Sequence, residues 1–155
     1  MSEDKQKKTG ILSYGLIVMA VSHTLTHVFG GIHTAVFSQL RDEFDLNLQQ
    51  LGLIASIPSL ASAILAIPVG LLSDRIGPKR MLLLSFGFAG LGAVLAGTAN
   101  TPLMLIVAVS LIYINTAIYH PASYAATAKM FKPEDRAKAM GLHGAGGTLG
   151  HAMGP

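Results

Sequence analysis

Long stretches without a charged side chain restrict most strongly how this chain can fold. A transmembrane helix needs about 20 consecutive, mostly apolar residues, so each stretch of that size is a candidate span. Such stretches lie near residues 10–40, 51–73, 81–99, 102–128 and 139–155. The pattern predicts an all-α transmembrane helical bundle in which residues 1–155 form one domain of about five spans. We expect the fifth span to be cut short at Pro155, so that the bundle is truncated.

The composition excludes a soluble domain. Only 12% of the residues are charged, whereas soluble domains have about 25%. The first apolar stretch is too long for a signal-peptide core of roughly 7 to 15 residues. A net charge of +3 does not indicate a nucleic-acid-binding protein, because the basic residues lie beside apolar stretches rather than on one polar surface. We therefore expect the lipid bilayer to surround the chain, and no nucleic acid to bind it.

The basic residues predict the orientation of the spans, because Lys and Arg in short loops stay on the cytoplasmic side. All but one of the 11 basic residues lie on alternate connections: Lys5, Lys7 and Lys8, then Arg75, Lys79 and Arg80, then Lys129, Lys132, Arg136 and Lys138. This predicts an amino terminus on the cytoplasmic side of the inner membrane. Asn47 and Gln50 have the spacing of a helix-capping box. The short connection at Asn100–Pro102 predicts that the third and fourth spans are antiparallel neighbours.

The loop after the second span carries the most specific motif. The stretch from Gly70 to Arg80 resembles the G-x-L-x-D-R-x-G-[RK]-[RK] signature of the major facilitator superfamily, with Pro78 where a basic residue is common. We expect Gly70 to permit close helix approach and Asp74 to pair with cations or a helix end. The alternative is a basic loop that only fixes topology. The resemblance implies a gate formed by Gly70, Asp74, Arg75, Gly77, Lys79 and Arg80.

Glycines repeat every fourth residue in the last span, at Gly146, Gly150 and Gly154. With Pro155 they resemble the G-x-x-x-G-P signature of antiporters in the same superfamily, which implies an antiporter. The alternative is a helix-packing seam, because small residues on one face let a neighbouring backbone approach. The His120-Pro121 pair in the fourth span and the glycines of the fifth resemble the fosmidomycin-resistance branch of that superfamily.

All six histidines fall within predicted spans, whereas every acidic residue lies at a span end or in a loop. Ionisable groups at membrane depth are costly and are therefore functional candidates. Helical spacing places His23, His27 and Thr34 on one face of the first span, and Tyr113, His120 and Tyr124 on one face of the fourth. These six residues are the predicted substrate or proton path. The alternative for each histidine is a neutral side chain that only stabilises helix packing.

Two further expectations concern ligands and neighbours. His23 and His27, at i and i+4, could hold a metal or haem. No cysteine or membrane-depth carboxylate completes such a shell, so we expect no metal and no cofactor. The small residues Ala55, Ser59, Ser62 and Ala66 form a stripe on the second span that predicts packing against a neighbouring helix.

The resemblance implies the amino-terminal half of a major facilitator transporter, with a missing carboxy-terminal half as its partner. We expect proton-coupled export of a small organic compound, with uptake symport or uniport as the alternative. His120 is the first choice for the proton carrier and His27 the second, unless the other half supplies a carboxylate. A membrane protein that binds haem or a metal through histidines is the alternative from a different functional class. Enzyme motifs for hydrolase or phosphate chemistry are absent from the sequence, so we expect no enzyme.

Overall fold

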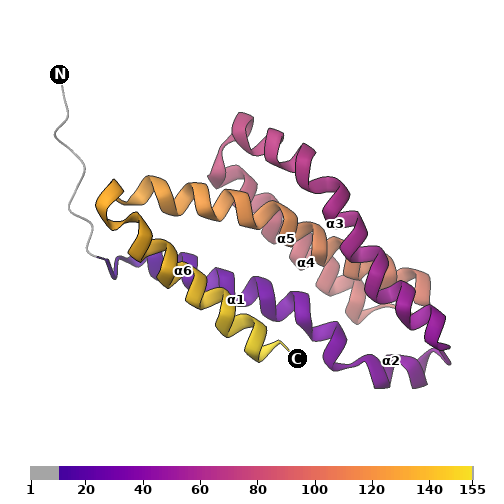
Figure 1. Ribbon diagram of the computed structural model, residues 1–155. Coiled ribbons are helices and arrows are strands. Elements are labelled where there is room, and N and C mark those ends of the chain that lie inside the picture. The colour runs from indigo at the N-terminus through magenta and orange to yellow at the C-terminus, as the bar shows by residue number, and fades with distance from the viewer. Residues whose placement is uncertain (1–10, 155) are drawn as a thin grey trace.

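The computed structural model describes residues 11–154, and within this range the chain is helical with no strand (Figure 1). Its elements are α1 (Tyr14–Ala35), α2 (Phe37–Glu43), α3 (Leu48–Ile76), α4 (Pro78–Gly97), α5 (Pro102–Met130) and α6 (Pro133–Met153). The predicted all-α transmembrane bundle is confirmed.

Four helices, α1, α3, α4 and α5, are long and apolar enough to cross a membrane. Helix α6 has 21 residues and is not among them. Its first two turns carry charged side chains, and glycines and histidines lower the hydropathy of the rest. It also begins at Pro133, six residues before the expected start at 139, because proline fits the first turn of a helix, where its missing N–H needs no partner.

The first apolar stretch is not one helix, as expected for residues 10–40, but two. Helix α1 starts after Ser13, whose side chain accepts a hydrogen bond from the backbone N–H of Leu16. It ends at Ala35, and Val36 separates it from the seven-residue α2. About 20 residues suffice to cross the hydrocarbon core, so the rest of this long stretch is free to turn. Gly10 lies outside the described residues.

Helix α5 is the centre of the bundle, because it packs against α1, α3, α4 and α6. In Figure 1, α6 runs alongside α1, whereas α3 lies on the other side of α5. Helices α4 and α5 are neighbours, as their short connection predicts. Gly92 of α4 permits this contact, because a Cβ there would lie 2.8 Å from the carbonyl oxygen of Ala108.

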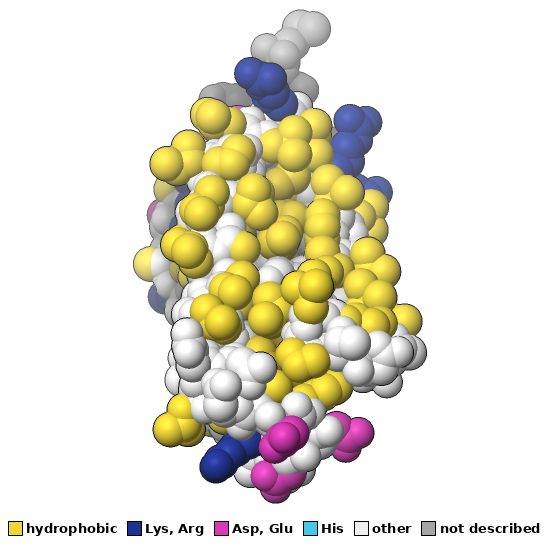
Figure 2. Space-filling model, turned by 90° about the vertical axis from the view of Figure 1, so that its right-hand side faces the viewer, with side chains coloured by type: hydrophobic (Ala, Val, Ile, Leu, Met, Phe, Trp, Pro, Cys, Tyr) yellow, Lys and Arg dark blue, Asp and Glu magenta, His cyan; other side chains and the backbone are white. Residues whose placement is uncertain are grey.

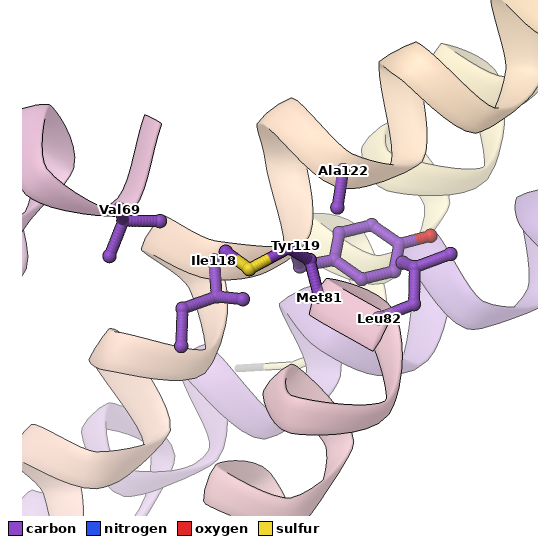
Figure 3. Close-up of a cluster of buried hydrophobic side chains, with 6 residues drawn as sticks. All are labelled: Val69, Met81, Leu82, Ile118, Tyr119 and Ala122. Atoms are coloured by element: carbon purple, nitrogen blue, oxygen red, sulfur yellow. The ribbon is translucent and has the colours of Figure 1, made fainter. Parts of the chain in front are cut away.

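Apolar side chains fill the contact between α3, α4 and α5. Figure 3 shows the cluster formed by Val69, Met81, Leu82, Ile118, Tyr119 and Ala122. The outer surface is apolar as well: on the face in Figure 2, hydrophobic side chains cover the middle and charged ones gather at the two ends. A soluble protein rarely exposes so large an apolar surface, which agrees with burial in a bilayer.

Candidate functional site: a histidine cluster between α1, α5 and α6

The loop signature forms the tight turn between α3 and α4. Gly77 adopts a positive φ of 80°, a conformation that glycine tolerates best, and its N–H donates to the carbonyl oxygen of Ser73 over 3.0 Å. Pro78 begins α4. The expected gate residues Asp74, Arg75, Lys79 and Arg80 are exposed at this end of the bundle.

No described helix packs closely against Gly70, although the motif predicts close helix approach there. No atom lies within 4 Å of a Cβ built at this residue, so the position is not a close helix contact. The residue instead lines a groove between α3 and α5. None of the described helices approaches Gly70 closely, so close helix approach at this residue stays a prediction.

The glycines of α6 face α1. A Cβ at Gly146 would overlap the carbonyl oxygen of Ala20, and a Cβ at Gly150 would overlap that of Thr24. At Gly154 it would lie 3.1 Å from the carbonyl oxygen of His27. The Thr24 hydroxyl donates to the carbonyl oxygen of Gly146 over 2.8 Å, which links the two helices. The glycines thus form a packing seam, and Pro155 lies outside the described residues.

Histidines of α1 and α5 meet beside this seam. The Nε2 atom of His27 lies 3.1 Å from Nε2 of His23, and the latter lies 3.4 Å from Nε2 of His120. One ligand atom of each of these three side chains lies within 4.8 Å of the other two. Three of the predicted path residues, from α1 and α5, therefore meet at one point inside the bundle.

Backbone carbonyl groups fix the orientation of two of these rings. Nδ1 of His23 lies 2.9 Å from the carbonyl oxygen of His143, and Nδ1 of His120 lies 2.8 Å from that of Thr116. A carbonyl oxygen only accepts hydrogen bonds, so Nδ1 is the protonated nitrogen of both rings. In the neutral rings their Nε2 atoms therefore carry lone pairs, and that of His23 accepts from Nε2 of His27.

Other aromatic rings surround the cluster. His143 stacks on His23 with ring centroids 4.3 Å apart, and His151 lies against His27 at 3.8 Å. Both rings come from α6. On α5, Tyr124 lies 6.2 Å from His120 and 5.5 Å from His143, measured between ring centroids. The predicted residue Tyr124 is thus at the edge of the cluster.

Two cavities reach the same region. One has a volume of about 310 Å³ and is lined by His27, Gly30, Gly31, Thr34, Tyr113, Thr116 and His151. The other is a groove of about 610 Å³ between α3 and α5, lined by Ser59, Ser62, Ala63, Ala66, Gly70, Tyr113, Thr116, Ala117, His120 and Pro121.

The predicted path residues divide between these cavities. His27 and Thr34 line the first, His120 lines the second, and Tyr113 borders both. His23 is only 4% exposed and lies behind His27 and His120. Three residues of the small-residue stripe on α3, Ser59, Ser62 and Ala66, line the open groove, and packing of the stripe against a further helix stays a prediction. Sequence reasoning also missed Thr116, which no ionisable group or motif marks.

Residues 14–155 match the family described as Major Facilitator Superfamily. The chain is 27% identical over 144 residues to the fosmidomycin resistance protein of Escherichia coli K12, covering 92% of this chain and 35% of that protein. It is 38% identical over 103 residues to the methyl viologen resistance protein SmvA of Salmonella typhimurium, covering 66% and 21%. A probable L-galactonate transporter of E. coli K12 is 29% identical, covering 75% and 26%.

The fold resembles a solved structure, a bacterial homologue of the human lysosomal transporter Spinster in an inward-facing and unoccupied conformation. The TM-score is 0.88 at 24% identity, over 96% of this chain and 31% of that one. The chain therefore spans about a third or less of the length of these relatives. With a family match over nearly all of its residues, this chain belongs to the major facilitator superfamily.

Proposed function

We propose that the chain forms the amino-terminal helical bundle of a secondary carrier that exports a small organic compound across the inner membrane, driven by protons. The observation that carries the proposal is the pair of cavities between the apolar helices, both lined by hydroxyl and imidazole groups. Ligand pockets combine an apolar lining with a few placed polar groups. Carrier sites typically lie where spanning helices meet near the bilayer midplane.

The direction of transport is proposed from the relatives. Two of them are named for resistance to fosmidomycin and to methyl viologen, and resistance to a toxic compound is what an exporter confers. The probable L-galactonate transporter favours the second candidate, an uptake carrier of the same fold. Both candidates use the same cavities and differ in the direction of net movement.

In this proposal, the working carrier consists of this helical bundle and a second one. Alternating access in such carriers is a rocking of one bundle against the other around a central site. The chain spans only part of the length of the relatives it matches. Sequencing the gene and its transcript beyond codon 155 tests this step: a continuation through further apolar spans supports it, and a stop codon there contradicts it.

The complete carrier, expressed in cells sensitive to both compounds, tests the transport proposal with fosmidomycin and methyl viologen as probes. Export predicts lower accumulation of at least one probe than in cells with an empty vector. A protonophore should raise that accumulation to the level of the control. Higher accumulation in the expressing cells would favour the uptake candidate, and export that persists after the protonophore would contradict proton coupling.

A further inference from the structure

We propose that His23, His27 and His120 bind one divalent transition-metal ion through their three Nε2 atoms, with Zn²⁺ as the best-matched ion. This site goes beyond the transport proposal and does not depend on the direction of transport. Zinc–nitrogen bonds of about 2.0–2.1 Å in a tetrahedral arrangement place neighbouring ligand nitrogens about 3.4 Å apart. The Nε2 atom of His23 lies 3.1 Å from that of His27 and 3.4 Å from that of His120. The ligand atoms of all three residues lie within 4.8 Å of one another, so small ring rotations bring the set to the spacing that one ion requires.

The second argument is the way in which the rings are held. Histidines that ligate metals almost always donate their other ring N–H to a carboxylate, a backbone carbonyl or water, which fixes the ring and its tautomer. His23 and His120 both do this, through the carbonyl oxygens of His143 and Thr116. The free lone pair of each ring is thereby directed to the centre of the cluster.

Hydrogen bonds among the three neutral rings leave the Nε2 lone pair of His120 without a donor. The Nε2 lone pair of His23 accepts a hydrogen bond from His27. Nε2 of His120 also carries a lone pair, and it lies 3.4 Å from the same atom of His23, so the two nitrogens cannot bond to each other as neutral rings. The Nε2 atom of His120 is therefore available to a ligand that accepts its lone pair. A metal ion can accept the lone pairs of His23 and His120, and that of His27 once the proton of this ring has moved from Nε2 to Nδ1.

The chemistry of the ligands selects the ion. Imidazole nitrogen suits zinc, copper, iron and nickel, whereas magnesium and calcium take oxygen ligands. Three imidazoles leave the fourth tetrahedral position of zinc to another ligand. His27 lines the cavity of about 310 Å³, which gives water or an anionic ligand a route to that position. Sequence spacing revealed only the first two ligands, because His120 comes from a helix 93 residues further along the chain than His27.

The test is metal binding by the complete carrier, purified in detergent with an affinity tag that contains no histidine and stripped with a chelator. Titration calorimetry with Zn²⁺ should give one ion per chain, and Co²⁺ should show the visible absorption of a tetrahedral site. Each of the variants His23→Gln, His27→Gln and His120→Gln should weaken zinc binding at least about tenfold. Absence of zinc and cobalt binding by the wild-type protein would overturn the proposal.

His33→Gln is the matched control, because His33 is also buried on α1 but lies outside the cluster. It should bind zinc like the wild-type protein. His23 is the most buried ligand, and its replacement is the one that most threatens folding; His120, which is partly exposed, supplies the second test. Zinc should raise the thermal unfolding midpoint of the wild-type and His33→Gln proteins but not of His120→Gln. Equal zinc binding by wild-type and His120→Gln proteins would show that the ion binds elsewhere.

Discussion

Tyr119 shows how one residue joins the parts of this bundle. Its side chain is fully buried, and the ring packs between α3, α4 and α5 (Figure 3). Its hydroxyl lies 2.7 Å from Oγ of Ser22 and donates to the carbonyl oxygen of Met19 over 3.0 Å. The phenol therefore links the core around α5 to α1. Its acceptor on α1, Met19, lies one helical turn before His23.

Replacing Tyr119 by phenylalanine should destabilise the carrier by about 1 kcal/mol, since polar contacts between membrane helices are each worth that or less. The ring still fills its space, so the protein should fold. A thermal unfolding midpoint a few degrees lower in detergent would agree with this. Tyr14→Phe is the control, because Tyr14 is 83% exposed, and equal midpoints for both variants would contradict the bridging role.

Asp74 is the residue of the loop signature to which we assign a gate. It is exposed at the end of α3, where a carboxylate can pair with a cationic or helix-end partner during opening and closing. We expect Asp74→Asn to abolish most transport by the complete carrier while expression and membrane insertion stay intact. Asp42→Asn, at the opposite end of the bundle, is the control. Unchanged transport in Asp74→Asn would reduce the loop to a topology signal.

The sequence singled out His23, His27 and His120 but did not show that they lie together. His23, His27 and His120 stand out because ionisable groups are rare in apolar stretches, and the helical repeat places His23 beside His27. The distance between His23 and His120 follows from the packing of α1 against α5, which no local spacing reveals. The carbonyl contacts that orient the rings depend on the same packing.

The contact between α6 and α1 places the rings of His143 and His151 against the cluster. Gly146 and Gly150 let the backbones approach, because a Cβ at either position would overlap a carbonyl oxygen of α1. Backbone atoms cannot rotate away as a flexible side chain can, so alanine must push the helices apart. The rings of His143 and His151 would then move away from His23 and His27.

Gly146→Ala should therefore destabilise the carrier by roughly 1–3 kcal/mol, the usual cost of overpacking. Gly144→Ala is the matched control on the same helix. No atom lies within 4 Å of a Cβ at Gly144, and alanine favours a helix over glycine by up to about 1 kcal/mol. Thermal unfolding in detergent should give a lower midpoint for Gly146→Ala and an equal or higher one for Gly144→Ala. The reverse order would contradict the seam.

Helix boundaries were predictable where local chemistry fixes them. Asn47 and Gln50 form the expected capping box, with both hydrogen bonds at 2.9 Å, and Gly77 with Pro78 makes the turn into α4. The break at Val36 was missed, because the apolar stretch continues through it without proline or charge. The early start of α6 was missed for the opposite reason, since charged residues there had suggested a loop.

Charge is segregated along the long axis of the whole molecule. Charged side chains gather at the two ends of the face in Figure 2, and apolar side chains cover the surface between them. The acidic residues Asp42, Glu43 and Asp45 lie at the connection from α2 to α3. Arg75, Lys79 and Arg80 join α3 to α4, and further basic residues join α5 to α6. This arrangement fits a chain that crosses the bilayer repeatedly, and we expect its basic connections to lie in the cytoplasm.

Reporter fusions test that orientation. Fusions after Lys8, Pro78 and Lys132 should report the cytoplasm, and fusions near Asp42 and Thr101 should report the opposite side, because basic loops are retained in the cytoplasm. A reporter active only in the cytoplasm and one active only outside it should give opposite patterns along the chain. An inversion at any one of these sites would contradict the alternating topology.

The central claim is that the cavities between α1, α3 and α5 form the substrate path. The most direct test is to measure transport by the complete carrier in which His120 is replaced. His120 lines the groove of about 610 Å³, and glutamine keeps much of its size but not its imidazole. Energised membrane vesicles carrying the wild-type protein should move a probe compound, and His120→Gln should reduce that movement to background. Thr148→Ala, on the exposed side of α6, should transport like the wild type. Wild-type transport by His120→Gln would contradict the account.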